Sequence, residues 1–93
     1  MRAIWNDTVR AESDDTVVVE GNHYFPPEAL TPGVFAASSK TTFCAWKGRA
    51  NYYTVRAGGE ENPDAAWYYE DPYRAAAKIK NHVAFWRGVT VEE

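Results

Sequence analysis

Turn-forming residues recur along this chain at such short intervals that only short extended segments fit between them. Near the N-terminus, Asn6-Asp7 and Ser13-Asp14-Asp15 separate the segments "RAIW", "TVRAE" and "TVVVE". Asn and Asp tolerate the backbone geometries that reverse a strand, and short alternating segments between turns are typical of antiparallel sheets. Residues 2–20 are therefore predicted to form a three-strand β-meander.

A second β-meander is predicted over residues 40–70. The segments "KTTFCAW", "NYYTVR" and "AAWYYE" are separated by Lys47-Gly48-Arg49, by Gly58-Gly59 and by Asn62-Pro63-Asp64. Residues 21–39, between the two meanders, contain three prolines and two glycines, and proline is rare in central strands. We expect this stretch to be a long ordered loop.

One short helix is predicted near residues 72–80, followed by a return to strand. Asp71 is a suitable N-cap, Pro72 suits the first helical position, and an alanine-rich segment follows. The chain has 93 residues, which is enough for one hydrophobic core. The sequence thus predicts a single compact domain over residues 1–93, mainly β (α+β), with two antiparallel β-meanders in a sandwich-like arrangement.

Charge and composition disfavour several classes of protein. Thirteen acidic and ten basic residues give a net charge of −3, with the basic residues scattered, whereas nucleic-acid binders need a basic patch. No apolar segment approaches the ~18 residues of a membrane helix. The first residues lack the features of a signal peptide, and a single cysteine cannot form an internal disulfide. We expect a cytoplasmic protein that binds neither nucleic acid nor membranes.

Aromatic residues are abundant, with four Trp, six Tyr and four Phe. Strand alternation places Trp67 and Tyr69 on one face of the sheet and Tyr68 on the other, and it likewise separates Tyr52 from Tyr53. A sheet with only one buried face sends polar side chains outward. The rings on both faces therefore either pack in the core and against the long loop, or cover a cavity or a partner.

The segment "CAWKGRANYY" holds the main candidates for a binding site. Lys47, beside Gly48, is placed to contact an anionic or carbonyl group of a ligand, or to act as a base or Schiff-base amine if desolvated. The favoured hypothesis is a small-molecule-binding module whose rings enclose a planar or cationic ligand, with the proline-rich loop as a rim. The candidate ligand-binding residues are Glu20, Asn22, His23, Tyr24, Cys44, Trp46, Lys47, Tyr52, Trp67 and Tyr69.

Two alternatives stay open beside the binding module. One is a small enzyme in which Lys47, Cys44 or His23 does covalent or acid–base work, and the other is a homodimer or partner-binding domain. One Cys and two His are too few for a structural zinc site, and Gly58-Gly59 lies in a predicted hairpin rather than before a helix. We assign no catalytic residue, cofactor or metal.

Four stretches carry a resemblance to a known family: "WNDTVRAESDDTVVVEGNHYFP", "CAWKGRANYY", "NPDAAWYYEDP" and "IKNHVAFW". In order and spacing they resemble the bacterial domain of unknown function 427 family over nearly the whole chain. The resemblance implies a compact β-tent-like domain, in which two antiparallel sheets meet at an angle, and whose relatives by shape include zinc-bound domains and domains with an aromatic cage. Here the cage would involve Trp46, Trp67 and neighbouring tyrosines.

The same family is sometimes labelled nucleotidyltransferase-like. That chemistry places a Gly-Ser near two metal-binding carboxylates spaced by one residue. This chain offers Glu12-Ser13-Asp14-Asp15, which lacks both the preceding glycine and the alternate spacing. The sequence does not support the label.

Overall fold

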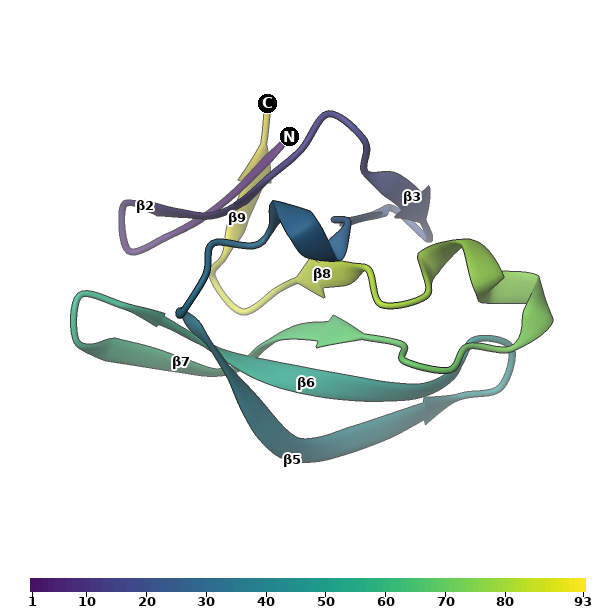
Figure 1. Ribbon diagram of the computed structural model, residues 1–93. Coiled ribbons are helices and arrows are strands. Elements are labelled where there is room, and N and C mark those ends of the chain that lie inside the picture. The colour runs from purple at the N-terminus through teal and green to yellow at the C-terminus, as the bar shows by residue number, and fades with distance from the viewer.

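The computed structural model describes residues 1–93 as two layers of antiparallel strands (Figure 1). A four-stranded sheet forms the lower layer of the view, and a three-stranded sheet and a two-stranded hairpin lie above it. The mainly β fold class predicted from the sequence is confirmed. The strands are β1 (Arg2–Trp5), β2 (Thr8–Glu12), β3 (Val17–Val19), β4 (Asn22–Tyr24), β5 (Phe35–Cys44), β6 (Gly48–Ala57), β7 (Glu60–Tyr68), β8 (Val83–Phe85) and β9 (Thr90–Glu92).

The N-terminal strands do not form the predicted three-strand meander. β1 and β2 pair as expected, but the third member of their sheet is β9, in the order β2-β1-β9. β3 instead turns back at Glu20 and Gly21, both with positive φ, and pairs with β4 in a separate hairpin. The hairpin is tied to the large sheet because Phe25, directly after β4, exchanges two backbone hydrogen bonds of 2.8 Å with Val83 of β8.

The second meander is present and longer than predicted, with strand order β5-β6-β7-β8. β5 begins at Phe35, so the expected loop 21–39 contains β4, the first residues of β5 and a 3-10 helix, η1 (Pro27–Ala29). Asn62-Pro63-Asp64 is not a turn, because β7 runs through it. The pairing of β6 with β7 shifts register there, and Asp64 has positive φ. Pro63 thus lies in a β-bulge, where its missing N–H is tolerated.

The predicted helix exists as a 3-10 helix, η2 (Arg74–Ile79), interrupted by non-helical dihedrals at Ala76. It begins two residues later than expected, after Tyr73 rather than Asp71, and no side chain caps it. The segment is held instead by its buried residues Ala76 and Ile79 and by backbone contacts around Asn81, which has positive φ and follows the C-cap Lys80.

Two clusters of buried residues form the core, and consecutive residues of one segment can face different clusters. Alternate side chains of β8 face different clusters, and so do the consecutive residues Tyr24 and Phe25. The first cluster consists of Ala3, Ala11, Phe25, Val55, Ala65, Ala66, Val83 and Phe85. The second consists of Val19, Tyr24, Ala50, Tyr52, Tyr69, Ala76, Ile79 and Ala84. The large sheet therefore buries rings on both faces, as strand alternation predicted.

Candidate functional site

The tight turn between β5 and β6 positions Trp46 and Lys47. Cys44 pairs with Gly48 across the hairpin, so residues 45–47 form the turn, and the predicted strand through Trp46 ends at Cys44 instead. Gly48 has φ of 109°, and a Cβ there would lie 3.5 Å from the carbonyl oxygen of Asp71. Glycine is favoured at this φ. The segment after β7 packs against this turn, and the Tyr73 N–H donates to the Lys47 carbonyl at 3.0 Å.

Lys47 is buried, with 7% of its surface exposed, and its ammonium group forms an ion pair with Glu20 from the β3–β4 turn. Burial disfavours the charge of Lys47, but the hydrogen bond to Glu20 and nearby tyrosine oxygens outweigh this and raise the pKa of Lys47. The same hydrogen bond lowers the pKa of Glu20. Trp46 also donates its indole N–H to Glu20 at 3.4 Å. Both partners of the pair are therefore held in their charged forms at neutral pH.

Beside this ion pair lies a small hollow, which we call the aromatic hollow. Its volume is about 160 Å³, and it is lined by Lys47, Tyr52, Trp67, Tyr69 and Trp86. The indoles of Trp67 and Trp86 meet edge to face at 5.8 Å between centroids, and Tyr52 lies 6.4 Å from Trp86. The Trp67 indole N–H donates to the Tyr24 hydroxyl at 3.1 Å. Burial raises the pKa of the Tyr69 hydroxyl to about 12, so the hydroxyl stays protonated.

Two residues near the aromatic hollow were missed by sequence analysis. Trp86 follows β8 and is aligned by hydrogen bonds to Ala65 and Asp64 on β7. Lys40 lies in β5 where the register with β6 shifts, and its ammonium group lies 5.1 Å from the ring centroid of Tyr52 and 5.7 Å from that of Trp86. The "FW" pair after a short apolar segment was the available signal for Trp86, and nothing local marked Lys40.

Three of the remaining candidates, Asn22, His23 and Tyr24, lie on β4, and the fourth, Cys44, ends β5. Tyr24 is fully buried in the second core cluster, and half-buried Cys44 packs against that cluster. His23 pairs with exposed Val18 on the outer face of the hairpin and makes a hydrogen bond of 2.8 Å with Thr16. Asn22 is half-buried, and its side chain makes no hydrogen bond within the chain. His23 is thus not brought to Cys44, whereas Glu20 is brought to Lys47.

Two larger depressions lie away from the predicted residues. One, of about 460 Å³, lies between β2 and the β6–β7 hairpin, and a polar one of about 420 Å³ lies near the start of β6, beside Arg49 and Asp71. No three His, Cys, Asp or Glu side chains gather where they could hold a metal ion. None of the helices has the length and apolar character needed to cross a bilayer. Of the ten residues predicted from the sequence, four line the aromatic hollow, namely Lys47, Tyr52, Trp67 and Tyr69.

Comparison with known proteins gives one informative match. A search of curated proteins found no significant match. The model of the family described as Domain of unknown function (DUF427) matches residues 1–93. This match spans the whole chain and includes the turn that carries Lys47 and the strands that carry the rings. The chain therefore belongs to the DUF427 family.

Proposed function

We propose that this domain is a binding module for a small planar molecule that carries an anionic or carbonyl group. The ring of such a ligand packs in the aromatic hollow, and its polar group faces Lys47. The observation that carries the proposal is the position of a buried, charged lysine in the wall of a hollow whose other four lining residues are aromatic.

The size of the hollow limits the ligand to about one ring. Drug-sized ligands occupy pockets of roughly 300–1,000 Å³, whereas an apolar cavity of about 150 Å³ holds a single benzene molecule. The aromatic hollow, at about 160 Å³, belongs to the second size class. Edge-to-face and tilted rings form its walls, and these provide faces and edges on which one further ring can pack.

The charges around the hollow favour an anion over a cation. Lys47 lines it and Lys40 lies over two of its rings, while Glu20 is the one carboxylate in contact with these lysines. Lys40 already occupies the position that a ligand cation would take over Tyr52 and Trp86. Of the two ligand types expected from the sequence, the planar ligand with an anionic or carbonyl group is therefore the better match.

The same geometry gives less support to the enzyme alternative. A lysine that acts as a base or Schiff-base amine needs a depressed pKa, whereas the pKa of Lys47 is raised by its partner Glu20. His23 lies on the other face of its hairpin from the core cluster that Cys44 contacts. Lys47 is suited to hold a negative charge in place.

The test uses benzoate and benzylamine, which share one ring and differ in charge. We expect benzoate to quench the tryptophan fluorescence saturably and to bind more tightly than benzylamine, because two lysines flank the rings. Trp86→Leu should weaken benzoate binding by about tenfold or more, since a wall of the hollow is lost. Binding is measured by fluorescence titration at constant ionic strength.

Trp5→Leu is the matched control, because Trp5 packs against the first core cluster and does not line the hollow. Trp46 is unsuitable, since its indole contacts Glu20 and lies 5.2 Å from the ammonium group of Lys47. The Trp5→Leu protein should retain the benzoate affinity, and circular dichroism should show that both variants are folded. The absence of saturable quenching by either probe, or equal losses in the two variants, would contradict a binding site in the hollow. Tighter binding of benzylamine would contradict the preference for an anion.

A further inference from the structure

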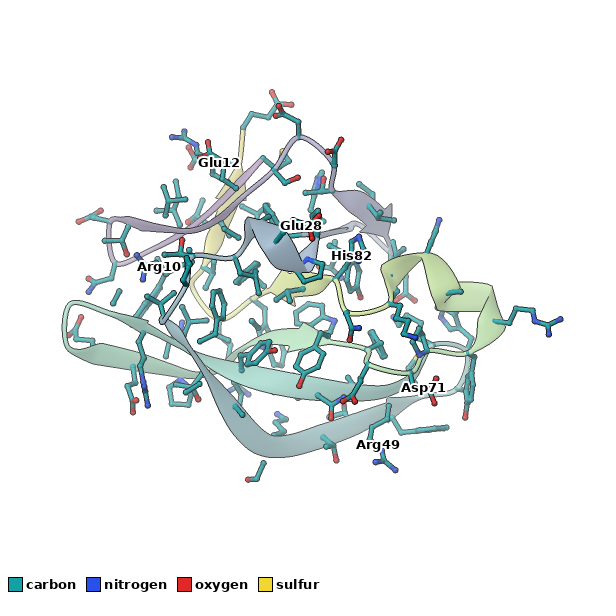
Figure 2. The ribbon with its side chains drawn as sticks, viewed as in Figure 1. Arg10, Glu12, Glu28, Arg49, Asp71 and His82 are labelled. Atoms are coloured by element: carbon teal, nitrogen blue, oxygen red, sulfur yellow. The ribbon has the colours of Figure 1, made fainter.

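One of the two larger depressions lies at the other end of the large sheet from Lys47. We call it the arginine cavity. It has a volume of about 460 Å³ and lies between β2 and the turn of the β6–β7 hairpin. Figure 2 shows Arg10 in this region, between the upper layer and the hairpin, whereas Arg49 and Asp71 lie toward the opposite end. Its lining residues are Thr8, Arg10, Val34, Arg56, Ala57, Gly58, Gly59, Glu60 and Glu61.

A β-bulge turns Arg10 inward. Ala3 pairs with Ala11 and the next residue, Ile4, pairs with Val9, so Arg10 is the extra residue of β2. Bulges redirect side chains and recur next to functional sites. Apolar side chains are usually buried and charged ones exposed. Here the apolar Val9 is 37% exposed while Arg10 is only 8% exposed.

The buried guanidinium group of Arg10 has no carboxylate partner. Its Nη1 donates to the backbone carbonyl of Arg56 at 2.8 Å, and its Nε is buried with no hydrogen-bond partner. No ion pair includes Arg10. Burying a charge without a counter-charge is costly, so an anion that enters the cavity beside Arg10 gains a partner that the chain does not supply.

The other charged residues of the lining are Arg56, Glu60 and Glu61, so together with Arg10 the lining carries two positive and two negative charges. Arg56 and Glu61 neutralise each other through a contact of 2.8 Å. Gly58 and Gly59, both with positive φ, form the hairpin turn, and neither N–H donates a backbone hydrogen bond. Amides exposed in such turns are common anion donors. Glu60 also lines the cavity without an ion-pair partner, so it opposes every anion and opposes one with a single negative charge least.

From this arrangement we propose that the arginine cavity binds a small monocarboxylate. The carboxylate lies against the guanidinium of Arg10, and the Thr8 hydroxyl and the glycine amides of the hairpin turn are the neighbouring donors. The planar fork of arginine matches the two oxygens of a carboxylate. This site shares no lining residue with the aromatic hollow, so it does not depend on the function proposed there.

The test is a titration of the ¹⁵N-labelled protein with sodium acetate, with sodium chloride balancing the ionic strength. We expect saturable shifts of the Thr8, Gly58 and Gly59 amide signals, and none when chloride alone is varied. Arg10→Lys should weaken acetate binding by about tenfold or more, because a lysine keeps the charge but loses the fork. Arg49→Lys, at the opposite end of the sheet, is the matched control and should leave the affinity unchanged.

A second variant keeps the test decisive if Arg10→Lys fails to fold. Glu60→Gln removes the competing carboxylate and should tighten acetate binding. The absence of saturable shifts in both the unmodified protein and Glu60→Gln would overturn the proposal, and so would equal shifts with acetate and chloride. Trp86→Leu should leave the acetate shifts intact, which separates this site from the aromatic hollow.

Discussion

Lys47 and Arg10 are the two buried cations of this domain, and they differ in whether a carboxylate balances their charge. They are almost equally buried, with 7% and 8% of their surface exposed. Lys47 has a carboxylate partner, Glu20, from another turn of the same chain. Arg10 has only a backbone carbonyl. The first cation is paired with a carboxylate within the fold, while the second lies beside the arginine cavity without an ion-pair partner.

This difference shows that burial alone does not reveal what a charged side chain is for. A cation with an internal partner stabilises and orients its surroundings, and at the same time it can present residual positive charge to a ligand. A cation with no counter-charge costs stability in the free protein. Its presence is more easily explained by a ligand than by the fold. The following three predictions test this contrast.

The largest effect is expected when Lys47 loses its partner. Glu20→Gln leaves the buried ammonium group of Lys47 without a counter-charge, and an unpaired buried charge is costly even though the Glu20 side chain is itself half exposed. We expect the unfolding temperature to fall by several degrees. Lys47→Met combined with Glu20→Gln should recover part of the loss, as measured by thermal denaturation at neutral pH.

Glu61→Gln is the control for that experiment. It also removes a glutamate from an ion pair, with Arg56, but both side chains of that pair are more than half exposed. Exposed pairs contribute little, so the unfolding temperature should barely change. Equal effects of the two substitutions would mean that the Lys47–Glu20 pair is no more important than a surface pair.

A smaller effect is expected at alkaline pH. Burial raises the pKa of Tyr69 to about 12 from the ordinary 10.0, and the pKa of Lys47 is also raised. Both groups bind protons more tightly when folded, so their contribution is complete below pH 10 and is lost as the pH rises through the folded pKa values. Stability to urea should therefore decrease above pH 10.

Tyr69→Phe provides the check on that assignment. Tyrosine ionisation is followed by ultraviolet absorbance, and the transition near pH 12 should disappear in this variant. A titration in which every tyrosine ionises near pH 10 while the protein is folded would show that Tyr69 is not shielded from water.

The smallest effect on stability is expected for Arg10→Met. The substitution removes an unpaired buried charge, which is favourable, and also the hydrogen bond to the Arg56 carbonyl, which is worth about 1 kcal/mol. We expect the free energy of unfolding to change by no more than about 1 kcal/mol, measured by urea denaturation. A loss comparable to that of Glu20→Gln would show that Arg10 is primarily structural.

The pairing of strands that follow one another in the second meander was predictable from the sequence, whereas the partners of β3 and β9 were not. Turn residues correctly separated β1 from β2 and β6 from β7. The partner of β3 was wrong because the turn at Glu20-Gly21 pairs β3 with the next strand, β4. The third strand of the first sheet is instead β9, from the other end of the chain. Strand alternation correctly placed Trp67 and Tyr69 on one face, since this depends only on neighbouring residues.

The candidate site was also only partly predictable, because some of its residues are brought there by strand pairing. Lys47, Tyr52, Trp67 and Tyr69 line one hollow, but Trp46 does not. Glu20 reaches Lys47 from 27 positions away. Trp86 was missed because only the pairing of β7 with β8 brings it to the hollow. Arg10 was missed because a bulge reverses the face on which a side chain lies, and the sequence of "TVRAE" gives no sign of it.

The pairing of β1 with β9 has a consequence for how this domain is made. Arg2 of β1 lies opposite Glu92 of β9 in the same sheet. Strand β9 therefore emerges from the ribosome only after almost all the other residues of the domain have been synthesised. Contacts of such high sequence separation slow folding. The β1–β2 hairpin therefore lacks its third strand, β9, until translation of the domain is nearly finished.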